Sequence, residues 1–237
     1  GLFVRIALIR RLEADLMHAM LSTRPAYSQL GREALLPHKV FSYEKAADEV
    51  CADGISTKGT EARSKVLQKA VARSKAITAE DFLKTTNAKT AFKDIDLIYI
   101  YSNMIDKTGD DKASEGMVFK ATEDEMAHIL QMIDLIRNGN GCNILITSDH
   151  GYLYQNETLD ETDFSDFKVM GDTIIQDTRR FVIGRELEEG DAVKTWRAED
   201  VGLTDSTGIS PLQVQTAKGL NRIRIKGAGS RFVHGGS

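Results

Sequence analysis

A chain of 237 residues with 41% hydrophobic and 28% charged residues has the length and balance of an ordinary globular protein with a full core. Its net charge of −4 gives no overall attraction to nucleic acid or to an anionic membrane surface. No apolar run approaches the roughly 20 residues that span a bilayer. The two cysteines show neither a disulfide framework nor a zinc-type spacing, which favours a reducing, cytoplasmic compartment.

The two ends of the chain indicate a piece of a longer protein. The sequence starts at Gly1 without a methionine and stops at Gly-Gly-Ser. We therefore expect residues 1–237 to form a single domain excised from a larger chain.

The first elements predict the beginning of a parallel α/β sheet. Residues 2–9 read as a strand, and residues 10–21 follow with helical apolar spacing. A turn is expected at 25–28, and a short helix at 29–36 that Pro37 closes.

The next segment is rich in charge. Helical periodicity is present around residues 60–76, and residues 78–83 have the acidic start of a capped helix. We interpret residues 41–90 as an inserted helical layer or cap.

Two more buried strands are expected, at 96–101 and 143–147, with the clearest amphipathic helix between them at 122–137. Strand, helix and strand with short joints imply a right-handed parallel crossover. The expected fold class is therefore α/β, with a mostly parallel central sheet flanked by helices, the helical cap, and a β-rich C-terminal part.

The C-terminal part changes pattern after Tyr154. Short β-rich pieces are expected at residues 178–184, 192–196, 212–216 and 222–225. They predict an antiparallel extension of the sheet or a small β subdomain.

Asp149 and His150 directly follow the expected strand at 143–147. Open α/β sheets bind their ligands at the carboxyl ends of strands. A carboxylate together with an imidazole is a common ligand mixture for Zn²⁺ or Mn²⁺. Asp149 could instead cap a turn, and the pair alone leaves both interpretations open.

Three other segments carry groups that bind metals or act as nucleophiles. Asp106 and Asp110 are four residues apart, so a helical turn would put both carboxylates on one face. His234 precedes two glycines, and Ser28 stands where a helix begins and an anion is favoured. Each has a structural alternative: solvated turn carboxylates, an exposed histidine, or an N-cap serine.

In this order the segments resemble the PglZ domain, a branch of the alkaline phosphatase superfamily. The matching stretches are Pro25-Ala-Tyr-Ser-Gln-Leu-Gly31 with Ala34-Leu-Leu-Pro-His38, Tyr99-Ile-Tyr-Ser-Asn-Met-Ile-Asp-Lys-Thr-Gly-Asp110, Ile146-Thr-Ser-Asp-His-Gly-Tyr152, and Arg231-Phe-Val-His-Gly-Gly236. They run from near the start of the chain to its end, and they are specific only as a set.

The resemblance implies a phosphatase or phosphodiesterase in a bacterial phage-resistance system of the BREX type, working with other defence proteins, or in a signalling protein that carries this domain. It implies up to two divalent ions, Zn²⁺ first and Mn²⁺ as the alternative. Ser28, where relatives usually have threonine, would attack phosphorus and form a phosphoseryl intermediate. The implied ligands are Asp106, Asp110 and His234 for one ion, with Asp110 in place of the superfamily's usual histidine, and Asp149 and His150 for the other.

One departure from the family lies near the N-terminus. Leu8 stands where PglZ-like domains have a metal-binding aspartate, and leucine cannot bind a metal. Arg11, close by, is a candidate to bind a phosphate oxygen of the substrate. Leu8 keeps open an alternative function, a scaffold domain without turnover that acts through protein contacts. A nucleotide-binding module has little support, because the chain has no Gly-rich phosphate loop.

Overall fold

The computed structural model describes residues 23, 28–44, 49–157, 168–178, 181–203, 211–217 and 231–234. The predicted strand at 2–9, helix at 10–21 and strand at 222–225, and most of the turn at 25–28, lie outside these residues.

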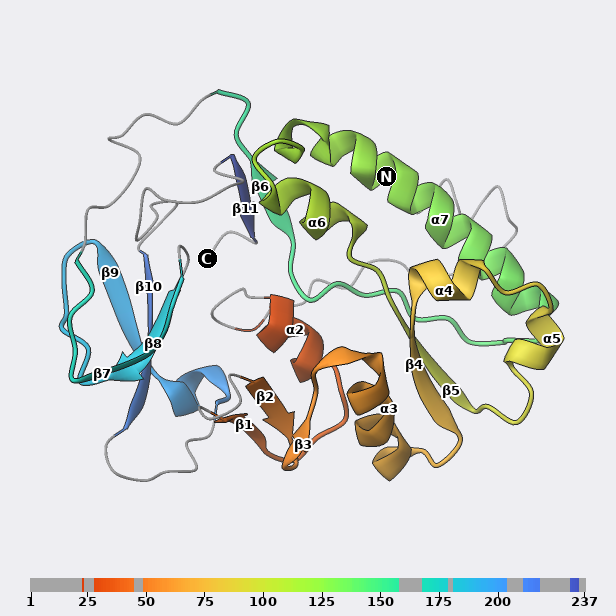
Figure 1. The fold of residues 1–237 in the computed structure, drawn as a ribbon, viewed down its shortest axis with the longest axis horizontal. Helices are drawn as coiled ribbons and strands as arrows, with labels where there is room; N and C mark the ends of the chain where they lie inside the picture. The colour runs from red at the N-terminus through yellow and green to blue at the C-terminus, as the bar shows by residue number, and fades with distance from the viewer. Residues whose placement is uncertain are drawn as a thin grey trace.

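The described helices and strands are interspersed as far as α7, and strands predominate after it (Figure 1). The helices are α2 (Ser28–Ala34), α3 (Gly59–Ala70), α4 (Ala79–Leu83), α5 (Ala88–Ala91), α6 (Met104–Asp110) and α7 (Val118–Asn138), with 3-10 turns η1 (Glu115–Met117) and η3 (Ala198–Val201). The strands are β1 (Phe41–Glu44), β2 (Glu49–Ala52), β3 (Ile55–Ser56), β4 (Ser74–Thr78), β5 (Leu97–Tyr101), β6 (Tyr152–Tyr154), β7 (Thr173–Asp177), β8 (Phe181–Arg185), β9 (Val193–Arg197), β10 (Leu212–Ala217) and β11 (Phe232–His234).

Four small sheets make up the described β-structure. Strands β4 and β5 pair in parallel, in a register from Ser74 opposite Leu97 to Thr78 opposite Tyr101. The other sheets are antiparallel, in the orders β1-β2-β3, β7-β8-β10-β9 and β11-β6. The fold is thus mixed α/β, with a small parallel sheet and an antiparallel C-terminal sheet.

One core cluster lies between the parallel strands and the long helix. Phe82 of α4 and Met132 of α7 are buried there, with Ile77 of β4 and Ile100 of β5 packed against them. Helix α7 runs above this layer with α6 beside it (Figure 1). The apolar stripe of α7 therefore packs against α4 and, through this cluster, against β4 and β5.

The largest core cluster joins the N-terminal and C-terminal halves of the chain. Leu30 of α2, Val50 of β2 and Leu67 of α3 belong to it, and so do Phe181 of β8 and Val214 of β10. The antiparallel C-terminal sheet therefore packs on the elements around α2 instead of forming a core apart from them.

Several predicted elements are confirmed. The structure has α2, β5 and the C-terminal strands β9 and β10 close to the predicted bounds, while α7 starts four residues earlier and β8 three residues later than expected. Helices α3 and α4 are also present within the segment predicted to be helical.

The helical description of residues 41–84 is wrong in part, because β1 to β4 lie in this segment. Strands β2 and β3 are joined by Asp53 and Gly54, both with positive φ (50° and 74°). An Asp-Gly pair with two positive φ values is typical of a tight hairpin, and it was the sequence signal available here. Strand β4 pairs with β5, so the segment also contributes to the parallel sheet.

The predicted buried strand at 143–147 is not formed. No strand is assigned to these residues, and Leu145 is 89% exposed. Its crossover from β5 through α7 is therefore absent from the described residues. An apolar run of this length shows that burial is favoured, but a strand also needs a hydrogen-bonded neighbour, which the run does not specify.

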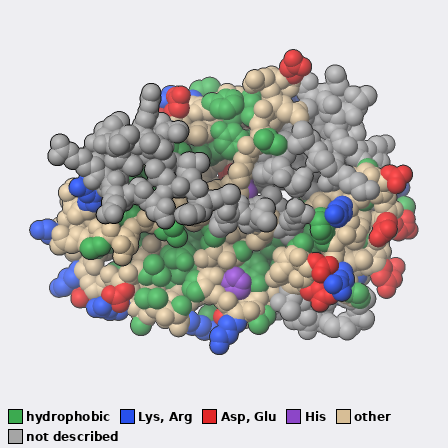
Figure 2. All heavy atoms as spheres, turned by 180° about the vertical axis from the view of Figure 1, so that it is seen from behind, with side chains coloured by type: hydrophobic (Ala, Val, Ile, Leu, Met, Phe, Trp, Pro, Cys, Tyr) green, Lys and Arg blue, Asp and Glu red, His purple; other side chains and the backbone are tan. Residues whose placement is uncertain are grey.

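The described part of the back face has a hydrophobic area with charged side chains near its edge (Figure 2). Figure 2 shows hydrophobic side chains gathered in the lower middle of that face, with charged side chains of both signs around its edge. Within the described residues, no helix combines the length and the apolar character that crossing a membrane requires.

Candidate metal and nucleophile site

Ser28, the first residue of α2, lies between two of the predicted ligands. Its Oγ donates a hydrogen bond of 2.9 Å to Oδ2 of Asp106, in the first turn of α6. The same Oγ lies 3.0 Å from Nε2 of His150, which stands just before β6. Three segments that are far apart in the sequence thus meet at one hydroxyl group.

Asp106, Asp149 and His150 form a group of the kind that holds a metal ion. One ligand atom from each residue lies within 4.8 Å of the other two. Nε2 of His150 is 3.5 Å from Oδ2 of Asp106 and 3.6 Å from Oδ2 of Asp149. His150 is only 8% exposed, so an ion here would be shielded from water on the imidazole side.

The backbone fixes the tautomer of His150. Nδ1 lies 2.9 Å from the carbonyl oxygen of Gly151, which can only accept a hydrogen bond. Nδ1 therefore carries a proton, and in the neutral ring Nε2 has the lone pair. A carbonyl that orients a histidine in this way is the usual second partner of a metal-binding imidazole.

Asp149 fits a cation, because its buried oxygen lacks a donor. Oδ2 of Asp149 has no hydrogen-bond partner within the described part of the chain. Burial raises the pKa of the Asp149 carboxyl, the charge of Asp106 adds to this, and the charge of His150 opposes it. An ionised carboxylate oxygen without a hydrogen-bond donor is costly in such a place, and a divalent ion would stabilise its charge.

The pKa of His150 is raised above its ordinary value of 6.5. Burial works against protonation of the ring, but the hydrogen bond to Asp106 and the charges of Asp149 and Asp106 outweigh it. Without a cation, a proton on His150 therefore serves as the counter-charge of the two carboxylates. The negative charges of Asp106 and Asp149 therefore favour the binding of a cation at this group.

Gly31 lets α2 approach the segment that carries Asp149. A Cβ at Gly31 would lie 2.8 Å from Cβ of Asp149 and 3.1 Å from its carbonyl oxygen. Contacts this short are essentially absent from folded proteins, so no larger residue fits without a shift of the backbone. The distance between Ser28 and the metal-type group, by which we mean Asp106, Asp149 and His150, thus depends on this glycine.

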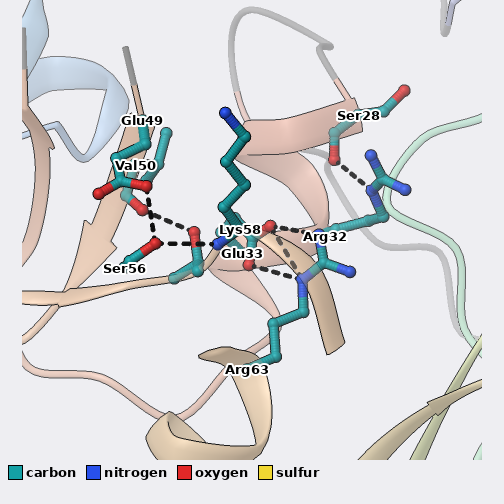
Figure 3. A network of polar contacts seen from close by, with 9 residues as sticks. Ser28, Arg32, Glu33, Glu49, Val50, Ser56, Lys58 and Arg63 are labelled. Carbon is teal, nitrogen blue, oxygen red and sulfur yellow. Dashed lines mark hydrogen bonds and ion pairs between the residues drawn. The ribbon is translucent and has the colours of Figure 1, made fainter. Parts of the chain in front are cut away.

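A buried ion pair holds α2 from the opposite side (Figure 3). Glu33 accepts hydrogen bonds from Nε (3.1 Å) and Nη2 (2.8 Å) of Arg63, on α3. The guanidinium of Arg63 also lies over the ring of Tyr101, 4.6 Å from its centre, at the end of β5. Burial raises the pKa of Glu33, and the hydrogen bond and charge of Arg63 oppose this rise.

A cleft of roughly 410 Å³ opens beside Ser28. It is lined by Ser28, Arg32, Glu33, Lys58, Gly59, Arg63, Asn103, Asp106, Lys107 and Asp110. Four of these side chains are cationic, and one of the three acids, Glu33, is paired with Arg63. Such a lining suits a negatively charged ligand next to the serine hydroxyl.

The structure brings together four of the predicted site residues, namely Ser28, Asp106, Asp149 and His150. It groups Asp106 with Asp149 and His150, whereas the family pattern implied a different ion for Asp106. Asp110 ends α6 and lines the same cleft but lies outside this group.

For the remaining predicted site residues, the structure describes the backbone alone or nothing. Strand β11 pairs with β6 so that His234 is opposite Tyr152, two positions after His150, and the His234 side chain is outside the description. Arg11 and Leu8 lie outside the described residues altogether.

Arg32 lines the cleft beside Ser28, but the sequence analysis did not identify it as a candidate site residue. It stands four residues after Ser28, and a helix puts residues with this spacing on one face. Given an expected helix that starts next to Ser28, that spacing was the signal that could have found it.

A serine hydroxyl beside an Asp-Asp-His group, in a mixed α/β chain, is compatible with a site of the alkaline phosphatase-like class. The comparisons agree with this class: residues 4–237 match the BREX system PglZ alkaline phosphatase-like domain, and the chain belongs to this family.

Two curated relatives are similar over 233 residues, or 96% of the chain. One is the alkaline phosphatase-like protein BrxZ of Escherichia coli O9:H4 (strain HS), at 32% identity. The other is the alkaline phosphatase-like protein PglZ of Bacillus cereus (strain H3081.97), at 33% identity. The chain spans about a quarter (26%) of the length of each. No solved structure matches the chain.

Proposed function

We propose that this chain is the metal-dependent phosphoester hydrolase domain of a BREX defence protein, with Ser28 as the nucleophile. The observation that carries the proposal is the contact of Ser28 Oγ with both Asp106 and His150, inside a group that fits a divalent cation. The partners are then a phosphoester substrate and other proteins of the BREX system.

Asp106, Asp149 and His150 would hold the ion, because they supply two carboxylates and one oriented imidazole. Zn²⁺ suits this donor set best, with Mn²⁺ as the alternative. The bound ion would lower the pKa of the Ser28 hydroxyl and neutralise charge on the phosphoryl group. Asp110 and His234 are the remaining candidates for a second ion.

Ser28 Oγ would give up its proton to water and form a bond to phosphorus, as the ester oxygen leaves with the bonding electron pair and takes a proton from water. Oγ donates a hydrogen bond to Asp106 and lies 3.0 Å from Nε2 of His150, so the hydroxyl already stands beside the atoms that would hold the ion. Water then hydrolyses the phosphoseryl group and restores the serine. Because Lys58 and Arg63 line the cleft, the segment 41–90 would help to select the substrate, which is the role of a cap.

Hydrolysis of bis-p-nitrophenyl phosphate and p-nitrophenyl phosphate, with added Zn²⁺ or Mn²⁺, tests the proposal. Turnover should require metal and should be lost in Ser28→Ala. Thr86→Ala, which removes a hydroxyl from an exposed residue between α4 and α5, is the matched control and should keep full turnover. Equal rates for the Ser28→Ala variant and its parent would refute the role of Ser28.

The second candidate function is a scaffold domain in a defence complex, and Leu8 favours it. If the aspartate that PglZ-like domains have at this position is indispensable, the protein binds at most one ion and hydrolyses neither ester. Absence of turnover with any added metal, in a folded protein, would support the scaffold.

A further inference from the structure

We propose that Arg32 is the substrate-binding residue of the site, and that its two terminal nitrogens bind the non-bridging oxygens of the phosphoryl group that Ser28 attacks. This inference rests on the proposed function for its chemistry. The observations behind it are the place of Arg32, the orientation of its guanidinium, and the charges around it.

Arg32 lies one helical turn after Ser28 and lines the same cleft. Its Nε donates a hydrogen bond of 2.9 Å to the carbonyl oxygen of Ser28 (Figure 3). The guanidinium is therefore anchored to the backbone of the nucleophile itself. Because the guanidinium is planar, the hydrogen bond at Nε restricts the directions in which the two terminal nitrogens can donate.

The terminal nitrogens of Arg32 make no hydrogen bond or ion pair with any residue that the structure describes. The nearest acid in the sequence, Glu33, is fully buried and taken up by Arg63. A half-buried guanidinium with an anchored Nε and two unused donors is thus available to a ligand in the cleft.

The cations of the cleft outnumber its carboxylates and favour an anionic ligand beside Arg32. Lys58 and Lys107 line the cleft from its exposed parts and add to the positive potential. Arginine matches two oxygens of a phosphate at once, whereas lysine acts as a point charge. The ligand class is therefore a phosphate ester, with the arginine fork on two of its free oxygens.

Inorganic phosphate is the probe for the test, because it is the product of a monoesterase and needs no turnover to bind. Its affinity would be measured by calorimetry on the metal-loaded protein, for the parent, Arg32→Met and Arg32→Lys. Arg137→Met, an exposed arginine at the end of α7, is the matched control for the loss of one charge.

Arg32→Met should weaken phosphate binding roughly 10- to 100-fold, as expected for the loss of hydrogen bonds to a charged group. It should raise KM for bis-p-nitrophenyl phosphate and leave the metal content unchanged. Arg32→Lys should lose less, and Arg137→Met should lose nothing. The assignment is overturned if Arg32→Met binds phosphate as tightly as the parent, if it loses its metal, or if the parent binds no phosphate.

The Ser28→Ala variant separates this inference from the proposed function. It should bind phosphate in an Arg32-dependent way without any turnover. If the parent also lacks turnover but binds phosphate through Arg32, the hydrolase function fails and the assignment of Arg32 stands.

Discussion

The protonation state of His150 determines the net charge of the group formed by Asp106, Asp149 and His150. Its Nδ1 is held by the Gly151 carbonyl, and its Nε2 faces Ser28 and two carboxylates. A proton and a metal ion therefore compete for the same nitrogen. The raised pKa of His150 shows that the carboxylates favour positive charge at this point.

The first prediction concerns pH. Because the folded-state pKa of His150 is raised, its protonation stabilises the metal-free protein fully below about pH 6.5, and this contribution is lost as the pH rises through the folded-state value. Metal binding needs the neutral ring, so the increase in Tm caused by Zn²⁺ or Mn²⁺ should grow between about pH 6 and pH 8.

The measurement is thermal unfolding with metal and with a chelator across this range. His150→Gln should remove the metal-dependent increase at every pH. His128→Gln, at a partly exposed position on α7, should leave it intact. A metal-induced increase that is the same at pH 6 and pH 8 would contradict the role of His150.

At the scale of elements, α2 carries both Ser28 and Arg32 and is fixed on two sides. On one side Gly31 permits contact with Asp149, and on the other Glu33 pairs with Arg63. A seven-residue helix has little stability of its own, so its position depends on these contacts.

The second prediction is that Gly31→Ala moves the nucleophile away from the metal-type group. The added Cβ would lie 2.8 Å from Asp149 Cβ, and the forced shift should cost about 1–3 kcal/mol of stability. Metal affinity and turnover should both fall. Gly116→Ala is the control, because the nearest atom to a Cβ there is 3.9 Å away. If both variants unfold at the same denaturant concentration as the parent, the close approach is not limiting.

The third prediction concerns the buried ion pair. Glu33→Ala leaves Arg63 as an unpaired charge in the interior and should lower the free energy of unfolding by about 3–5 kcal/mol. The double variant Glu33→Met with Arg63→Met should recover much of this loss, because both charges are gone. Urea denaturation of the three proteins gives the comparison. A double variant no more stable than Glu33→Ala would argue against the pair as the cause.

At the scale of the whole molecule, the site lies where distant parts of the chain meet. Ser28, Asp106 and His150 come from α2, α6 and the segment before β6, and the core that supports α2 includes β8 and β10. The C-terminal sheet therefore supports α2, which carries Ser28, through packing, although none of its described residues lines the cleft.

Four residues of the candidate site could be picked out from the sequence because their types and their order are distinctive. The reactive groups of these residues are known from the sequence alone, namely those of Ser28, Asp106, Asp149 and His150. Gly31 and the pair of Glu33 with Arg63 could not be predicted, because their roles arise only from contacts between segments that sequence patterns do not connect.

Secondary structure was predicted correctly where the helical periodicity of apolar residues is strong. It was missed where a strand forms only through pairing with a distant strand. The 21-residue helix α7 has enough turns to show its apolar stripe. Strand β4 is short and half-buried, and its ladder partner β5 begins well after it in the sequence, so its residues resembled the end of a helix. For residues 143–147 the apolar run was evident, but no strand pairing follows from it.

The most direct test of the account is the metal content and affinity of the parent compared with Asp149→Ala, by elemental analysis and calorimetry with Zn²⁺ and Mn²⁺. Asp124→Ala, which removes a partly exposed carboxylate from α7, is the matched control. The account predicts that the parent and the control bind metal, and that Asp149→Ala stays folded but loses the ion. Equal metal content and affinity in a folded Asp149→Ala variant would contradict the Asp106, Asp149 and His150 site.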